Sequence, residues 1–193
     1  MKEKVDLLRL TDEELAFGVG VNRDVKFFEE IYNRFSKKVY NKCLSFVKNQ
    51  EMAEDLTHDV FLQLFVTIRQ FKGKSKFSTW LYSLTYNYCV NYLNRDKNAK
   101  MLRESVEMHE TSEFVEEGNE NLLLEMESKL LEIALQKISH EERMILLLKY
   151  QDDTSVKELQ EVLGIGQSAV KMRLSRAKMN LLKAYKEIKH EQH

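Results

Sequence analysis

The sequence predicts an all-α protein of two small helical domains, and three observations support this fold class. Proline is absent and glycine occurs only six times in 193 residues, so helix interiors are almost free of their two strongest breakers. Apolar residues recur in steps of three and four along most of the chain, which is typical of one face of a helix. An acidic stretch interrupts this periodicity, and we interpret it as the junction between two domains.

The charge distribution locates that junction. The net charge is −1 overall, but residues 1–97 carry 16 basic and 13 acidic side chains, residues 98–127 carry 2 and 9, and residues 128–193 carry 12 and 9. Like charges at this density disfavour collapse, so residues 98–125 are predicted to be a flexible linker. A solvated helix face is the alternative, because glutamate forms helices well. The predicted domains are therefore residues 1–97 and 126–193.

The N-terminal domain is predicted to contain a short helix followed by a three-helix bundle. Lys2 to Val21 forms the short helix, and Thr11 with Glu14 has the spacing of a capping box. Apolar stripes indicate longer helices over residues 24–49 and 51–71, and an aromatic-rich helix over 78–95. The polar, glycine-bearing segment 72–76 between the last two is predicted to be a loop.

The C-terminal domain is predicted to end in a helix-turn-helix. Ser139–Glu142 and Ser155–Glu158 are two further capping boxes that open helices. A short helix over 156–163 ends at Gly164, because glycine adopts the left-handed conformation that ends a helix at little energetic cost. A long helix follows from about Gln167 to Glu187. Five apolar residues are placed to fill the angle between these helices: Leu159, Leu163, Ile165, Val170 and Leu174. In such a motif the second helix enters the major groove of DNA.

The composition argues against membrane-spanning, secreted and disulfide-bonded classes of protein. No apolar run approaches the roughly 18 residues of a membrane span, and the N-terminus, which carries acids, does not resemble a signal peptide. Cys43 and Cys89 lie in apolar helical patterns, so we expect buried thiols in a reducing cytosol rather than a disulfide. These features predict a cytoplasmic protein without a cofactor.

Three segments resemble the sigma-70 superfamily of transcription initiation factors. Residues 54–62 (EDLTHDVFL) resemble its core-polymerase-binding segment, residues 71–81 (FKGKSKFSTWL) its −10 loop and helix start, and residues 164–177 (GIGQSAVKMRLSRA) its −35 recognition helix. The order, spacing and length are similar to those of the extracytoplasmic-function (ECF) group, which keeps only regions 2 and 4. The resemblance covers roughly residues 24–97 and 126–188.

The resemblance implies an alternative sigma factor with three sets of site residues. A first set is expected to bind the beta-prime clamp helices of core RNA polymerase: Asp55, Asp59, Phe61 and Leu62. A second is expected to bind the −10 element during promoter melting: Lys72, Gly73, Lys74, Ser75, Lys76, Phe77, Trp80, Asn87 and Asn91. A third is expected to bind the −35 element: Ser168, Lys171, Met172, Arg173, Ser175, Arg176 and Lys178. The family also implies contact with the polymerase beta flap and an anti-sigma factor.

Two other classes of function compete with this one. A stand-alone helix-turn-helix regulator with an N-terminal sensing or dimerising bundle would share the DNA-binding motif but would not need a polymerase patch. An enzyme with a helical metal site could use Asp55 and His58 on one face of a helix, but a di-metal bundle needs several such pairs, and the sequence has no second one. We therefore expect no metal, no catalytic residues and no enzymatic activity.

Overall fold

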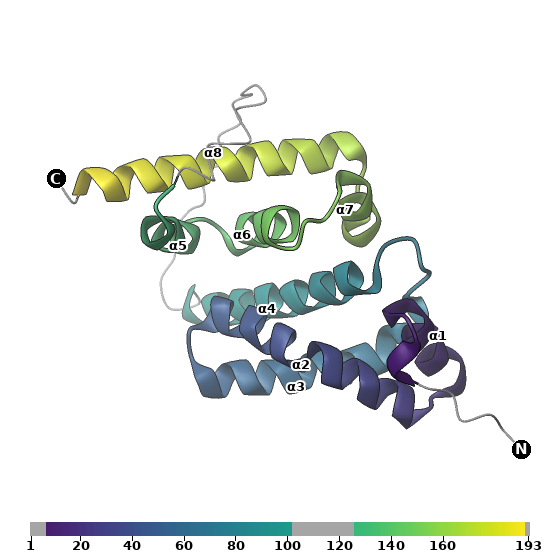
Figure 1. The fold of residues 1–193 in the computed structure, drawn as a ribbon. Helices are drawn as coiled ribbons and strands as arrows, with labels where there is room; N and C mark the ends of the chain where they lie inside the picture. Colours follow the sequence, from purple (N-terminus) through teal and green to yellow (C-terminus); the bar gives the residue numbers. More distant parts are fainter. Residues whose placement is uncertain (1–6, 102–125, 192–193) are drawn as a thin grey trace, which may run out of the picture. The chain divides into compact units, whose positions relative to one another are not determined.

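The chain divides into two compact units, one built from helices α1–α4 and the other from α5–α8 (Figure 1). The structure, a computed structural model, describes residues 7–101 and 126–191. Every regular element in these ranges is helical. The all-α class predicted from the sequence is therefore confirmed, whereas the exact domain boundaries at residues 97 and 126 stay predictions.

The first unit consists of four α-helices and two short 3-10 turns. They are η1 (Leu7–Arg9), α1 (Asp12–Asn22), α2 (Val25–Val47), α3 (Gln50–Thr67), η2 (Ile68–Gln70) and α4 (Phe77–Met101). Each of the first three helices starts after a polar residue, Thr11, Asp24 or Asn49, whose side chain accepts a backbone N–H of the first turn. Arg23 and Lys48 end α1 and α2 in the left-handed conformation.

The core of the first unit is aromatic and aliphatic, and it contains both cysteines. α2 packs along α3, and α1 packs across α2. Cys43 of α2 and Cys89 of α4 are fully buried, and their sulfur atoms lie 3.8 Å apart without a disulfide. The hydrogen bond from the Cys89 thiol lowers the pKa of Cys43, although burial acts in the opposite direction. The expectation of buried thiols is confirmed.

Arg34 of α2 ties the start of the chain to the bundle. Its guanidinium donates to the carbonyl oxygens of Leu7 (3.0 Å) and Leu10 (2.9 Å), and it pairs with Asp12 at 2.9 Å and Glu30 at 2.7 Å. Burial lowers the pKa of Arg34, but the two carboxylates outweigh burial and raise it above its ordinary value. A planar fork of donors suits this arrangement, so lysine would not replace it.

The second unit consists of four α-helices and one π-helical turn, and α8 is the longest of them. The elements are α5 (Ser128–Lys137), α6 (His140–Leu146), η4 (Leu147–Gln151), α7 (Val156–Leu163) and α8 (Gln167–Glu191). Both predicted capping boxes are present, at Ser139–Glu142 and Ser155–Glu158. α8 packs against α5 and α6, and Asn180 of α8 donates to Glu142 at 2.5 Å. The start of α6 is therefore held both by its own cap and by α8.

Helix ends differ from the predictions in three places. The helix expected over residues 2–21 is, where it is described, a 3-10 turn followed by α1. α4 continues to Met101, four residues into the segment predicted as linker, and α5 begins only at Ser128. Propensity and periodicity locate helix ends poorly, because capping decides them. The rest of the predicted linker, residues 102–125, lies outside the described residues.

Candidate nucleic-acid interface

Residues 72–76, named here the recognition loop, connect η2 to α4 as predicted. Lys72, Gly73, Lys74 and Lys76 are exposed, and Ser75 is half-buried. Gly73 has a φ of +69°, a left-handed conformation that glycine adopts without strain. Three cationic side chains on a loop of five residues can approach the phosphates of a nucleic acid strand.

A cluster of aromatic side chains at the two ends of this loop packs together and supports it. Phe71 and Phe77, which flank the loop, pack edge to face with ring centroids 5.5 Å apart. Trp80 lies 5.7 Å from Phe71 and 6.3 Å from Phe77, and it is half-buried. Phe77 is fully buried and also packs on Phe35. In this conformation the Phe77 side chain supports the loop and is not available to a ligand, whereas Trp80 retains an accessible surface.

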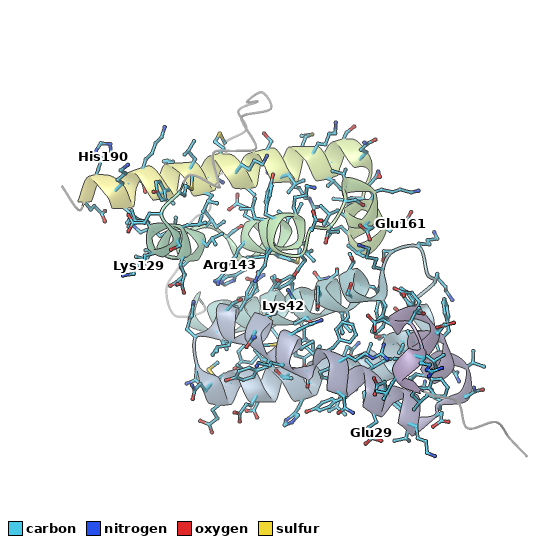
Figure 2. The ribbon with its side chains drawn as sticks, in the orientation of Figure 1. Glu29, Lys42, Lys129, Arg143, Glu161 and His190 are labelled. Atoms are coloured by element: carbon cyan, nitrogen blue, oxygen red, sulfur yellow. The ribbon has the colours of Figure 1, made fainter. Side chains whose placement is uncertain are left out.

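The helix after the loop, α4, carries a row of exposed polar residues on one face and aromatic residues on another. Asn87 and Asn91 are both exposed one turn apart on α4, so their amides share a face and can donate to or accept from a base edge. Lys42 of α2, which is labelled in Figure 2, lies over the Tyr82 ring at 4.0 Å and donates to the Tyr86 hydroxyl at 3.1 Å. Tyr86 is fully buried. The aromatic residues of α4 are thus divided between the core and the surface.

A stripe of acidic and apolar residues runs along the outside of α3. Asp55, Asp59 and Leu62 are all exposed, as a docking surface requires, and Val66 extends the stripe by one turn. These four residues are named here the docking stripe. Leu62 and Val66 leave 67% and 66% of their surface accessible, which is a large exposure for apolar side chains. Val66 was not predicted, because nothing in its sequence context separates it from the buried residues around it.

Phe61 does not belong to this surface. Its side chain is 4% exposed, and it packs against Tyr32 at 4.7 Å and Phe28 at 6.2 Å between ring centroids. Its position therefore fixes α3 against α2 instead of presenting a ring to a partner. Tyr88 of α4 is half-buried, and its hydroxyl donates to Asp59 at 3.1 Å. That bond orients one carboxylate of the docking stripe.

The second unit contains the predicted helix-turn-helix, formed by α7 and α8. Gly164 ends α7 with a φ of +64°, as the motif requires. Leu159 and Val170 are fully buried and Leu174 nearly so, while Leu163 and Ile165 are half-buried. These side chains fill the angle between the helices. The burial of Leu159, Val170 and Leu174 agrees with the sequence prediction, whereas Leu163 and Ile165 remain half-buried.

The outward side of α8 carries the residues predicted to bind DNA. Ser168, Lys171, Met172, Arg173 and Arg176 are exposed, and Ser175 is half-buried. With 100° per residue, Ser168, Met172 and Ser175 lie near the middle of this side, and Lys171, Arg173 and Arg176 lie toward its edges. Small polar and apolar groups therefore occupy the middle of the outward side, and cations flank them. Lys178 is half-buried, and its ammonium lies 5.3 Å from the Tyr150 ring centre.

Two general features of the described residues bear on other classes of function. No helix within residues 7–101 and 126–191 is long and apolar enough to span a membrane. In the same ranges, histidine, cysteine and acidic side chains do not gather in groups of three or more that could hold a metal ion.

Comparison with known proteins identifies the two units. Residues 31–99 match the family model for sigma-70 region 2, and residues 128–181 match that for sigma-70 region 4. The chain belongs to the sigma-70 superfamily. Within this superfamily it is an ECF-type factor, an alternative sigma factor that initiates transcription. A stand-alone regulator is not favoured, because its N-terminal bundle would not be expected to match region 2.

Relatives of known function match nearly the whole chain. The ECF RNA polymerase sigma factor SigW of Bacillus subtilis is 28% identical over 172 residues, covering 86% of this chain and 92% of SigW. The ECF RNA polymerase sigma-E factor of Haemophilus influenzae is 25% identical over 178 residues, covering 88% of this chain and 93% of that protein. Both alignments span the two helical units.

Solved structures show the same fold. CnrH, solved in complex with the cytosolic domain of CnrY, superposes with a TM-score of 0.58 at 18% identity, covering 89% of this chain and 95% of CnrH. The sigma factor RpoE of Bartonella quintana, solved with the anti-sigma factor NepR, gives a TM-score of 0.56 at 19% identity, covering 83% and 98%.

Proposed function

We propose that this sigma factor docks on core RNA polymerase through the docking stripe of α3 and reads promoter DNA through the recognition loop, α4 and α8. The observation that carries the proposal is the separation of surfaces within the first unit. The carboxylates of Asp55 and Asp59 and the exposed Leu62 and Val66 share α3, which carries no lysine or arginine, whereas three lysines lie within the five residues of the recognition loop. An anionic, apolar surface suits the basic beta-prime clamp helices, and a cationic loop suits DNA.

The −10 element is the proposed ligand of the recognition loop and α4. Lys72, Lys74 and Lys76 would neutralise phosphates of the opened strand, and Trp80 offers a half-buried ring beside which a base can stack. Asn87 and Asn91 would bond base edges further along the same strand. Gly73 gives the loop its shape.

The −35 element is the proposed ligand of α8. Met172 is 51% exposed near the middle of the outward side, where an apolar group can contact a thymine methyl. Ser168 and Ser175 would bond base edges, and Lys171, Arg173, Arg176 and Lys178 would bind phosphates. Two modest contacts gain from effective concentration once the polymerase fixes their spacing, to which its beta flap would contribute by holding the second unit.

An anti-sigma factor is a further proposed partner. The neighbour RpoE was solved with the anti-sigma factor NepR, and CnrH was solved with the cytosolic domain of CnrY. The chain acts where polymerase and promoter are, so we place it in the cytoplasm. The proposed activity is binding and strand opening, with no bond-breaking step and no cofactor.

Gel filtration with core RNA polymerase tests the docking stripe. The wild-type chain is expected to co-elute, and a variant with Asp55→Ala, Asp59→Ala and Leu62→Ala is expected to run alone. The matched control replaces two exposed carboxylates outside residues 54–62, Glu29→Ala and Glu51→Ala, and removes the same charge. The control should still co-elute. Equal loss in both variants would show that net charge, not the stripe, governs association and would refute the assignment.

A further inference from the structure

Helix α1 precedes the residues matched by the region 2 model, which begin at residue 31, yet it is joined to the unit's DNA-facing end. Its C-terminal end is held by two arginines. Arg69 of η2 donates from Nε to the carbonyl oxygen of Gly20 at 2.9 Å. Arg23 donates from Nη1 to the carbonyl oxygen of Phe65 at 2.6 Å, and its guanidinium lies over the Phe65 ring at 4.8 Å. α1 is therefore fixed against the segment that leads into the recognition loop.

The N-terminal end of α1 reaches the far side of that loop. Oε1 of Glu13 accepts the backbone N–H of Phe77, the first residue of α4, at 2.8 Å. A helix start leaves its first N–H groups without intrahelical acceptors. Lys76, which precedes α4, cannot cap it with its side chain, because an ammonium only donates. Glu13 supplies the missing acceptor from 64 residues earlier, and its negative charge suits the positive end of the helix dipole.

The middle of α1 touches the loop itself. The ring of Phe17 lies 5.5 Å from that of Phe71, immediately before the loop. A Cβ added to Gly73 would lie 3.2 Å from Cζ of Phe17. The left-handed turn at Gly73 is thus placed directly against Phe17, and the loop is supported at its start, at its turn and at its end by one helix.

We propose that α1 holds the recognition loop and the start of α4 in their DNA-binding conformation, and that Glu13 is a positioning residue for −10 recognition. The proposal rests on the proposed function of the loop. A carboxylate repels phosphate, so Glu13 acts through the Phe77 N–H and not by touching DNA. A loop already ordered before binding loses less conformational freedom when it binds, which increases affinity.

The test compares two adjacent glutamates of the same helical turn. Glu13→Ala removes the acceptor of the Phe77 N–H, whereas Glu14→Ala removes the same charge but only the two capping contacts that its carboxylate makes with Thr11. Glu13→Gln keeps an amide oxygen as acceptor. The probe is a short fluorescent single-stranded DNA selected from a randomised pool by wild-type holoenzyme. Glu13→Ala is expected to weaken binding about fivefold, and Glu14→Ala and Glu13→Gln less than twofold.

Two further measurements separate positioning from loss of fold. Hydrogen exchange at the Phe77 amide should accelerate in Glu13→Ala and not in Glu14→Ala. Co-elution with core polymerase and binding to duplex DNA carrying only the −35 element should be the same in all variants. Equal weakening in Glu13→Ala and Glu14→Ala, or unchanged exchange at Phe77, would overturn the positioning role.

A pair of loop substitutions tests the underlying function. Lys74→Ala with Lys76→Ala is expected to weaken binding of the same probe. If it does not, the recognition loop is not the −10 site and both proposals fail. If it does while Glu13→Ala binds as wild type, the loop assignment stands and the role of α1 is refuted.

Discussion

Gly164→Ala should destabilise the second unit by an amount set by backbone conformation alone. The residue has a φ of +64°, and a Cβ added there would meet no atom within 4 Å. The left-handed conformation costs a non-glycine residue about 1–2 kcal/mol. Alanine also restricts the unfolded chain, which offsets about 0.4–1 kcal/mol. The expected loss is therefore about 1 kcal/mol, and about half of that for Gly164→Asn, because asparagine tolerates this region.

A urea titration followed by two signals measures this loss. The chain has one tryptophan, Trp80, which lies in the first unit. Far-ultraviolet circular dichroism reports both units, so Gly164→Ala should lower the midpoint of its second-unit component by about 0.5–1 M. The fluorescence midpoint of Trp80 should not move. An equal shift in both signals would refute independent unfolding of the two units, and an unchanged dichroism curve would refute the backbone cost.

Two more outcomes follow from the described surfaces. Arg176→Ala should reduce the slope of log K against log salt by about 0.9 for promoter duplex binding, because it removes one phosphate contact. Met172→Ala should leave that slope unchanged and should lower affinity only for sites with thymine at the contacted position. A smaller slope for Met172→Ala and an unchanged slope for Arg176→Ala would contradict both assignments. The pKa of Glu14 is lowered by hydrogen bonds from the backbone and side chain of Thr11. The capping box therefore stabilises α1 above the ordinary glutamate pKa of 4.5, and this contribution is lost as acidification passes the lower folded pKa. Glu14→Gln, which removes the titrating carboxyl, should remove that part of the acid dependence of unfolding, and Thr11→Ala should remove only the share of the side-chain hydrogen bond.

The features predicted correctly from sequence are those that neighbouring residues decide. All three capping boxes depend on a serine or threonine and a glutamate three positions later, so the pattern and the contact coincide. Gly164 is similar, because its conformation ends α7 whatever surrounds it. The family resemblance added the order of the regions, which periodicity alone does not give.

The features that were missed depend on partners distant in sequence. Phe61 and Phe77 belong to motifs associated with binding, but other aromatic rings cover them in the fold. Glu13 looks like an ordinary first-turn acid of α1, and only the folded chain shows that it accepts the N–H of Phe77. Val66 likewise shares its apolar character with buried neighbours.

The contact between Glu13 and Phe77 also imposes an order on synthesis. Arg34 can bind Asp12 and the carbonyl of Leu10 as soon as α2 has left the ribosome. The Glu13 carboxylate can accept the N–H of Phe77 only after the ribosome has added 64 more residues to the chain. Because domains form progressively as the chain emerges, the bundle of α1–α3 can assemble first. The recognition loop acquires its final shape only when the polypeptide closes back on its own beginning.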